Sequence, residues 1–230
     1  MNILGFIPAR GGSKRIPRKN IKFFLGKPII SYPIKYLQEL GITPVVSTED
    51  DEIAYTASSF GAEIALRPKG LADDKTGTID VLIDYLEKTK TSPEFSLIVY
   101  ATAVFAKPNI LRSAFELIKK GNGVFPMVKY SYPPQRAVKI QGGLVRMVDE
   151  NLYNRNTQDF EPIYHDVGQF YLLRTKDLLK EKKLFLSRSI PLILKESEIQ
   201  DIDNEEDWIS AEIKYQMISQ RRRHPSRHVL

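Results

Sequence analysis

The chain has 230 residues, of which 42% are hydrophobic and 27% are charged, and it contains no cysteine. This composition is ordinary for one globular α/β domain with a buried core, and it excludes disulfides and cysteine-ligated metals. No run of about 18 apolar residues is present, so we expect no membrane-spanning helix. The N-terminus lacks the layout of a signal peptide, and we expect a cytoplasmic protein.

The formal net charge of +6 is concentrated in two segments. Residues 10–27 carry seven basic side chains, residues 221–230 carry four arginines, and neither segment contains an acid. Because these cations outnumber the net charge, the rest of the chain is mildly acidic. A concentrated basic loop suits a small polyanion, whereas a nucleic-acid duplex requires a basic stripe across one face. We therefore expect no nucleic-acid partner.

Hydrophobic patterning predicts alternating strands and helices over the first 130 residues. Short apolar runs predict strands at residues 2–7, 43–47, 63–66, 95–100 and 124–129. Apolar residues at helical spacing predict helices at residues 31–40, 50–60, 78–88 and 109–119. This alternation favours an α/β fold with a doubly wound, mostly parallel, Rossmann-like sheet. Such sheets bind ligands beyond the carboxyl ends of their strands, which places residues 8–20 at the site.

The alternation stops at about residues 131–165, where prolines, glycines and polar residues replace the strand-helix pattern. Residues 138–147 are typical of a hairpin that turns at two glycines. We interpret this stretch as an arm inserted into a single domain that spans residues 1–220. Further strands are predicted at residues 167–173 and 190–194, a final helix at residues 205–218, and a disordered basic tail at residues 221–230.

The loop after the first predicted strand has the composition of a phosphate site. Gly11 and Gly12 allow backbone N–H groups to approach a phosphate closely, and Arg10, Lys14, Arg15 and Lys19 add positive charge. The loop is neither a Walker A loop nor a dinucleotide-binding fingerprint. The alternative is a solvated basic loop that binds nothing.

Two carboxylates near the C-terminus allow two interpretations. Asp201 and Asp203 are two residues apart, so in an extended segment they point to the same side and can share a cation such as Mg²⁺. The alternative is a capping box for the last helix, in which Asp203 is the N-cap and Glu206 bonds back to it.

Two further polar segments are candidate sites. Tyr164-His165-Asp166 places a histidine beside a carboxylate, although sequence neighbours in a strand face opposite sides, and a polar rim is the alternative. Arg67-Pro68 and the loop that reaches Thr76 and Thr78 offer groups that can contact a base, and a plain loop with a helix cap is the alternative.

Taken together and in this order, these segments resemble the cytidylyltransferases that make CMP-activated nonulosonic acids, over nearly the whole chain to about residue 215. The resemblance is carried by Ile7-Pro8-Ala9-Arg10-Gly11-Gly12-Ser13-Lys14, Pro17-Arg18-Lys19-Asn20, Val46-Ser47-Thr48-Glu49-Asp50, Arg67-Pro68, Leu71-Ala72-Asp73-Asp74 and Asp201-Ile202-Asp203. Within this family, the stretches at residues 100–103, 134–137 and 158–171 are most similar to the pseudaminic acid enzymes.

The resemblance implies a role for each matching residue. Arg10 and Lys19 would act on the triphosphate, and Asp201 and Asp203 would be catalytic and bind Mg²⁺. The nucleotide would be bound by Ala9, Gly11, Gly12, Ser13, Lys14, Asn20, Arg67, Thr76 and Thr78. The sugar would be bound by Tyr100, Gln158, His165, Asp166 and Gln169. The resemblance also implies CTP and an acidic nine-carbon sugar as substrates, and a homodimer formed through the arm.

Two departures from the family pattern bear on the sugar. The sialic-acid enzymes commonly have Gln-Pro-Thr-Ser-Pro where this chain has Tyr100-Ala101-Thr102-Ala103-Val104, and they place an arginine near His165. Pseudaminic acid is therefore the expected substrate, and legionaminic acid, N-acetylneuraminic acid and the eight-carbon Kdo remain as alternatives. A protein that binds a nucleotide or nucleic acid without catalysis is a more distant alternative.

Overall fold

The computed structural model describes residues 1–73 and 75–223, and it is built on a central eight-stranded sheet. Seven strands follow the order β10-β7-β11-β6-β1-β4-β5, and β12 pairs with β7. Their bounds are β1 Ile3–Pro8, β4 Pro44–Thr48, β5 Glu63–Leu66, β6 Phe95–Val99, β7 Gly123–Lys129, β10 Tyr164–Asp166, β11 Phe170–Arg174 and β12 Ser189–Ile193. The pairs β6-β1, β1-β4, β4-β5 and β12-β7 are parallel, whereas β11 and β10 run antiparallel to their neighbours.

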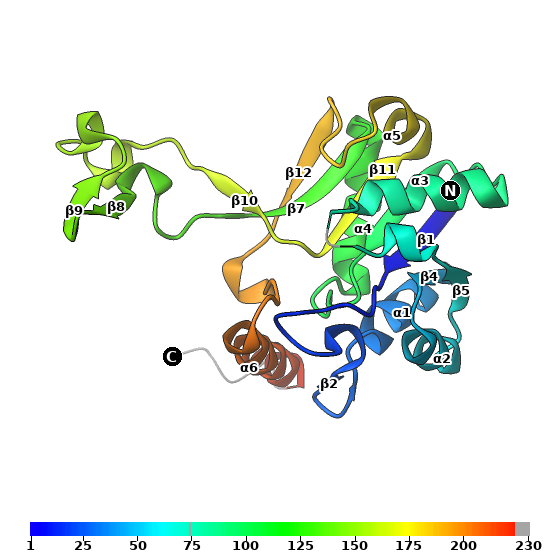
Figure 1. Cartoon of the computed structure of the whole chain (residues 1–230). Coiled ribbons are helices and arrows are strands. Elements are labelled where there is room, and N and C mark those ends of the chain that lie inside the picture. The colour runs from blue at the N-terminus through cyan, green and yellow to red at the C-terminus, as the bar shows by residue number, and fades with distance from the viewer. Residues whose placement is uncertain (74, 224–230) are drawn as a thin grey trace.

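Helices cover both faces of this sheet (Figure 1). Leu37 of α1 (Ser31–Gln38), Ile53 of α2 (Asp51–Ser59) and Leu111 of α4 (Pro108–Leu117) belong to one buried cluster. Leu82 of α3 (Thr78–Thr89) and Leu178 of α5 (Thr175–Glu181) belong to a second cluster, which includes strand residues of the opposite face. Successive strand residues point to opposite faces, so one sheet supports both cores. The expected doubly wound α/β fold is confirmed.

A third apolar cluster joins the two ends of the chain. Trp208 of α6 (Glu205–Arg223) packs against Phe24 of the short β2-β3 hairpin (Phe23–Phe24 and Lys27–Pro28), with ring centroids 5.7 Å apart. Ile16 and Ile202 are fully buried in the same cluster. This packing fixes the loop after β1 against the segment that precedes α6.

The expected arm is present and projects away from the sheet (Figure 1). Its hairpin consists of β8 (Val138–Gln141) and β9 (Leu144–Met147), and Gly142 and Gly143 both have positive φ at the turn. Several large apolar side chains of the arm are more than half exposed: Tyr132, Val138, Ile140, Leu144, Val145, Val148 and Tyr153. In the part of the chain that the structure describes, no helix is long and apolar enough to cross a bilayer.

The structure differs from the sequence expectations in four elements or segments. The strand expected at residues 167–173 begins only at Phe170, because Gly168 turns the chain with φ of +58°. The helix α5 and the β2-β3 hairpin were not expected. The last helix extends beyond residue 218 to Arg223, and the rest of the expected tail, residues 224–230, lies outside the described residues.

Candidate active site

A polar cleft of about 780 Å³ opens at the carboxyl ends of the parallel strands. The loop after β1, Arg67 after β5 and Tyr100 after β6 line one side of the cleft. The cleft is completed by Asp166 at the end of β10, by Gly168 in the turn before β11, and by the turn that contains Asp201. The antiparallel strand β11 presents its amino end here, because the Tyr100 N–H donates to the Gln169 carbonyl at 3.0 Å.

Four cations of the loop after β1 line the cleft, namely Arg10, Lys14, Arg15 and Lys19. Arg10 Nη1 donates to the main-chain oxygen of Asp73 at 3.0 Å. Asn20 Nδ2 donates to the main-chain oxygen of Arg10 at 2.9 Å, so Asn20 fixes the backbone from which the arginine projects. Ser13 also lines the cleft. The arrangement concentrates positive charge where an anionic ligand would lie.

The other side of the loop is fixed to the β4-α2 turn by carboxylates. Arg18 donates from both terminal nitrogens to Asp50, at 2.5 and 2.9 Å, and also to Glu52 at 2.5 Å. The hydrogen bonds from Arg18 are the main reason that the pKa of Asp50 is lowered to about 2. A Cβ on Gly11 would lie 2.5 Å from Asp50 Oδ2, so this close approach requires glycine.

The Gly11 N–H is not directed at the cleft in this conformation. It donates to Glu49 Oε1 at 2.7 Å, so the β4-α2 turn supplies the acceptor for this group. Ala9 is fully buried and its N–H donates to the Ser47 carbonyl at 2.9 Å. Gly12 is exposed, and neither glycine nor Ala9 lines the cleft. Side chains rather than loop amides therefore face the ligand space.

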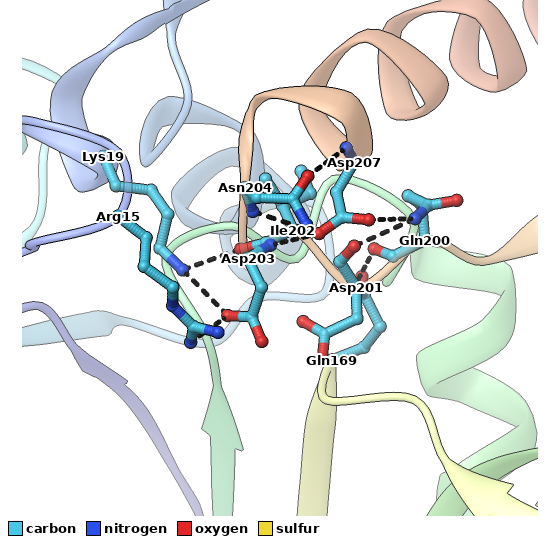
Figure 2. A network of polar contacts seen from close by, with 9 residues as sticks. All are labelled: Arg15, Lys19, Gln169, Gln200, Asp201, Ile202, Asp203, Asn204 and Asp207. Carbon is cyan, nitrogen blue, oxygen red and sulfur yellow. Dashed lines mark hydrogen bonds and ion pairs between the residues drawn. The ribbon is translucent and has the colours of Figure 1, made fainter. Parts of the chain in front are cut away.

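Asp201 and Asp203 lie opposite the cationic loop (Figure 2). Arg15 Nη2 donates to Asp203 Oδ1 at 2.8 Å, and Lys19 Nζ lies 3.6 Å from the same oxygen and donates to the Ile202 carbonyl at 2.7 Å. Asp201 stays accessible from the cleft, although protein crowds it on one side. This partial desolvation, followed by the negative charge of Asp203, raises the pKa of Asp201.

The paired carboxylates fit a hard divalent cation such as Mg²⁺. Both line one cleft, and a shared cation would offset the electrostatic repulsion between the two carboxylates. Among the described residues, no group of three or more histidine, cysteine, aspartate or glutamate side chains could form a complete metal site. Mg²⁺ commonly takes one or two carboxylates and completes its shell with water and substrate phosphates.

The expected capping box with Asp203 as N-cap is wrong by one residue. Asn204 Oδ1 accepts the N–H of Asp207 at 3.0 Å, and Asp207 Oδ2 accepts the N–H groups of Asp203 and Asn204 at 2.9 and 3.0 Å. Asn204 and Asp207 therefore fill the two positions of the box. The Asp203 side chain therefore does not cap the helix, and it faces the cleft.

Arg67, Thr76 and Thr78 form the wall next to the cationic loop. Arg67 Nη2 donates to the Ser47 carbonyl at 2.9 Å, and burial lowers the pKa of its guanidinium. Thr76 Oγ1 donates to Asp73 Oδ1 at 2.6 Å. Helix α3 begins after Gly77, whose N–H is accepted by Asp80 at 3.1 Å, so neither threonine is the N-cap.

The remaining wall is formed by Asp166 and by two tyrosines in edge-to-face contact. Tyr100 and Tyr171 pack edge to face with centroids 5.9 Å apart, and Tyr100 Oη lies 3.3 Å from Thr78 Oγ1. Tyr171 donates to one Asp166 oxygen, and the Gly168 N–H donates to the other at 3.1 Å. Burial raises the pKa of both tyrosines, which keeps them as neutral hydrogen-bonding groups.

Three expected sugar residues do not line this cleft. His165 stacks against Tyr130 with centroids 4.6 Å apart, and Gln158 lines a separate cavity of about 590 Å³ at the base of the arm. Gln169 is only 1% exposed and donates to the Gln200 carbonyl at 2.9 Å. Gln169 therefore lies beside the acidic turn rather than at the cleft surface.

The sequence reasoning did not single out Tyr171, Thr102 or Gly168 as site residues. Tyr171 lies near the amino end of β11, one residue after Phe170, and the alternation of a strand places these two side chains on opposite faces. The signal for Gly168 is the isolated glycine between two apolar runs, which is typical of a backbone turn. No sequence signal identifies Thr102.

A cationic loop that faces paired carboxylates across a polar cleft is the arrangement that nucleotidyl transfer requires. A model of the cytidylyltransferase family matches residues 4–220, and the chain belongs to this family.

Individual relatives agree with this assignment. The chain is 37% identical over 226 residues to the pseudaminic acid cytidylyltransferase of Campylobacter jejuni serotype O:23/36, covering 94% of this chain and 97% of that protein. It is 35% identical to the CMP-N,N'-diacetyllegionaminic acid synthase of Legionella pneumophila, covering 92% and 95%. The fold matches CMP:2-keto-3-deoxy-manno-octonic acid synthetase complexed with CTP, with a TM-score of 0.68, 16% identity, and 96% and 100% coverage.

Proposed function

We propose that the protein transfers a cytidylyl group from CTP to the anomeric oxygen of a nonulosonic acid, and that this sugar is pseudaminic acid. The observation that carries the proposal is the cleft in which Arg10, Lys14 and Lys19 face Asp201 and Asp203. The 37% identity to a pseudaminic acid cytidylyltransferase over nearly the whole chain supports both the reaction and the sugar. Because the reaction consumes CTP, we place it in the cytoplasm.

The reaction is an in-line substitution at phosphorus. The anomeric hydroxyl passes its proton to a carboxylate of the cleft, its oxygen bonds to the α-phosphorus of CTP, and the bond from that phosphorus to the oxygen that bridges to the β-phosphorus breaks to release pyrophosphate. Negative charge accumulates on the leaving group, where Arg10, Lys14 and Lys19 stabilise it electrostatically. The rest of the acceleration comes from holding the two substrates in line.

We assign Asp201 and Asp203 as the residues that hold Mg²⁺. When bound, the ion would neutralise part of the charge of the triphosphate. Arg15 and Lys19 form ion pairs with Asp203 at this place, with Arg15 68%, Asp203 41% and Lys19 21% exposed. Exposed ion pairs are weak, so Arg15 can exchange Asp203 for phosphate at small cost.

We assign the wall of Tyr100, Asp166 and Tyr171 to the sugar. The hydrogen bonds of Asp166 to Tyr171 and to the Gly168 N–H hold its carboxylate in one orientation at the cleft. An oriented acceptor beside aromatic rings suits a sugar that carries amide N–H groups, hydroxyls and a methyl group.

We also propose a homodimer in which the arm packs against a second copy. The arm projects from the sheet and exposes Ile140, Val145 and Tyr153, which are 80%, 70% and 68% exposed. An apolar patch of this kind on a projecting segment is typical of a protein interface.

The central test is pyrophosphate release from CTP across a panel of nonulosonic acids and Kdo, with ATP, GTP and UTP as nucleotide controls. We expect CTP- and Mg²⁺-dependent release that is fastest with pseudaminic acid. Release that is faster with legionaminic or N-acetylneuraminic acid would reassign the sugar. Absence of release with every sugar would refute the proposal.

A further inference from the structure

The turn that carries Asp201 and Asp203 is held by side chains from two other elements (Figure 2). From the turn that precedes β11, Gln169 donates to the Gln200 carbonyl at 2.9 Å. From α6, Lys214 Nζ donates to the Ile199 carbonyl at 3.1 Å and to Gln200 Oε1 at 2.9 Å. These contacts hold residues 199 and 200, which precede Asp201 and Asp203. The backbone at Asp203 itself is held by a different side chain.

That side chain is the carboxylate of Asp207, in the first turn of α6. One oxygen, Oδ2, accepts the N–H of Asp203 at 2.9 Å and the N–H of Asn204 at 3.0 Å. The other oxygen lies 3.5 Å from Gln200 Nε2. Asp207 does not line the cleft, so it cannot contact a ligand there and acts only through the backbone it holds.

The bonds at this turn divide into two functions. The Asn204 side chain accepts the N–H of Asp207, and the Asp207 carboxylate accepts the N–H of Asn204, so these two reciprocal bonds cap the helix. The bond from the Asp203 N–H to the Asp207 carboxylate lies outside the cap and fixes backbone that precedes the helix. The Asp203 N–H belongs to the residue whose carboxylate faces Arg15 and Lys19. Fixing this peptide group fixes the direction in which the Asp203 side chain leaves the chain.

We propose that Asp207 is a positioning residue, whose carboxylate anchors the 201–204 turn so that Asp201 and Asp203 face the cationic loop. This inference rests on the function proposed above. Both strong bonds converge on one oxygen, and the amide oxygen of asparagine can replace it, so the role depends on an acceptor and not on charge.

The test compares Asp207→Ala and Asp207→Asn with two neighbours on α6 in the full-length protein. Asn204→Ala removes the helix cap but leaves the Asp207 carboxylate in place, and Glu206→Ala removes one exposed negative charge from the same turn. For Asp207→Ala we expect kcat to fall by about 10²-fold, because a small displacement of reacting groups has this effect, with little change in the KM for CTP. We expect the other three variants to stay within about threefold of wild type.

Amide hydrogen exchange supplies a readout that needs no substrate. Exchange at the Asp203 and Asn204 N–H groups should accelerate at least about tenfold in Asp207→Ala and stay near wild type in Asp207→Asn. Equal losses of kcat in Asn204→Ala and Asp207→Ala would reduce Asp207 to a helix-stabilising residue. A loss in Asp207→Asn as large as in Asp207→Ala would show that charge matters instead, and either result overturns the inference.

Failure of the proposed function has a different signature. A wild-type protein that releases no pyrophosphate from CTP refutes that function. The exchange measurements would still decide whether Asp207 holds the turn.

Discussion

Arg10 is the residue to which the proposed mechanism assigns a contact with the triphosphate. It lines the cleft, and Asn20 and the Asp73 carbonyl hold its backbone and guanidinium. We expect Arg10→Ala to lower kcat/KM by about 10²-fold or more, because charge that develops in the transition state loses its donor. Lys27→Ala is the matched control, since Lys27 is an exposed cation on β3 outside the cleft. Near wild-type turnover by Arg10→Ala would remove this residue from the mechanism.

Arg18 belongs to the same basic loop but has a structural role. Its hydrogen bonds lower the pKa of Asp50 to about 2, so this pair stabilises the fold fully above the ordinary carboxyl pKa of 3.8. That contribution is lost as the pH falls through about 2. We expect Arg18→Met to be less stable than wild type in urea unfolding at neutral pH, and the difference to narrow between about pH 4 and pH 2.

The control for Arg18→Met is Lys119→Met, which removes an exposed ion pair between Lys119 and Glu116. Exposed pairs contribute little to stability, so this variant should unfold close to wild type over the whole pH range. A stability difference for Arg18→Met that is the same at every pH would contradict the coupling to Asp50.

At the scale of elements, helix α6 depends on a cap that the sequence did not locate correctly. Asn204 Oδ1 accepts the Asp207 N–H at 3.0 Å, so we expect Asn204→Ala to lower the free energy of unfolding by about 1 kcal/mol. Urea unfolding measures this change, and Asn204→Ser, which retains a capping oxygen, should recover most of it. Equal losses in the two variants would indicate that the asparagine does not act as a cap.

The order of most strands and helices was predictable, because these elements show their own hydrophobic pattern, but helix α5 and the β2-β3 hairpin were missed. The antiparallel placement of β11 was not predictable, because its partners β6 and β7 are selected by long-range pairing. Long-range contacts also decide the roles of the basic residues in the loop after β1. Nothing local distinguishes Arg18, which Asp50 and Glu52 bind from another element, from Arg10, which faces the cleft.

The candidate site was predictable where chemistry and position agree, as for the loop after β1 and for Asp201 with Asp203, which the structure brings to one cleft. The positions of His165 and Gln158 were less predictable. His165 contacts Tyr130, and Gln158 lines the separate cavity at the base of the arm. Their placement depends on how the arm packs, and a single sequence does not encode the partner of an exposed segment in any periodic pattern.

At the scale of the whole molecule, the proposed dimer predicts that charged substitutions in the arm prevent dimerisation. Ile140 and Val145 lie opposite each other on β8 and β9, and both side chains are exposed. We expect the double variant Ile140→Asp/Val145→Asp to be monomeric in analytical ultracentrifugation at a concentration where wild type is dimeric, because the charges cannot be buried. Tyr55→Asp, an exposed apolar site on α2, is the control. A dimer that survives the arm variant would place the interface elsewhere.

The ion pair between Arg15 and Asp203 spans 188 positions of the chain. During translation, the strands up to β6 and the whole cationic loop leave the ribosome long before the acidic turn does. A nascent chain that ends before residue 200 therefore has one half of the cleft, with its positive charge uncompensated by Asp201 and Asp203. The proposed catalytic site is therefore complete only once the acidic turn has been made and α6 has packed on the β2-β3 hairpin, with Asp203 opposite Arg15.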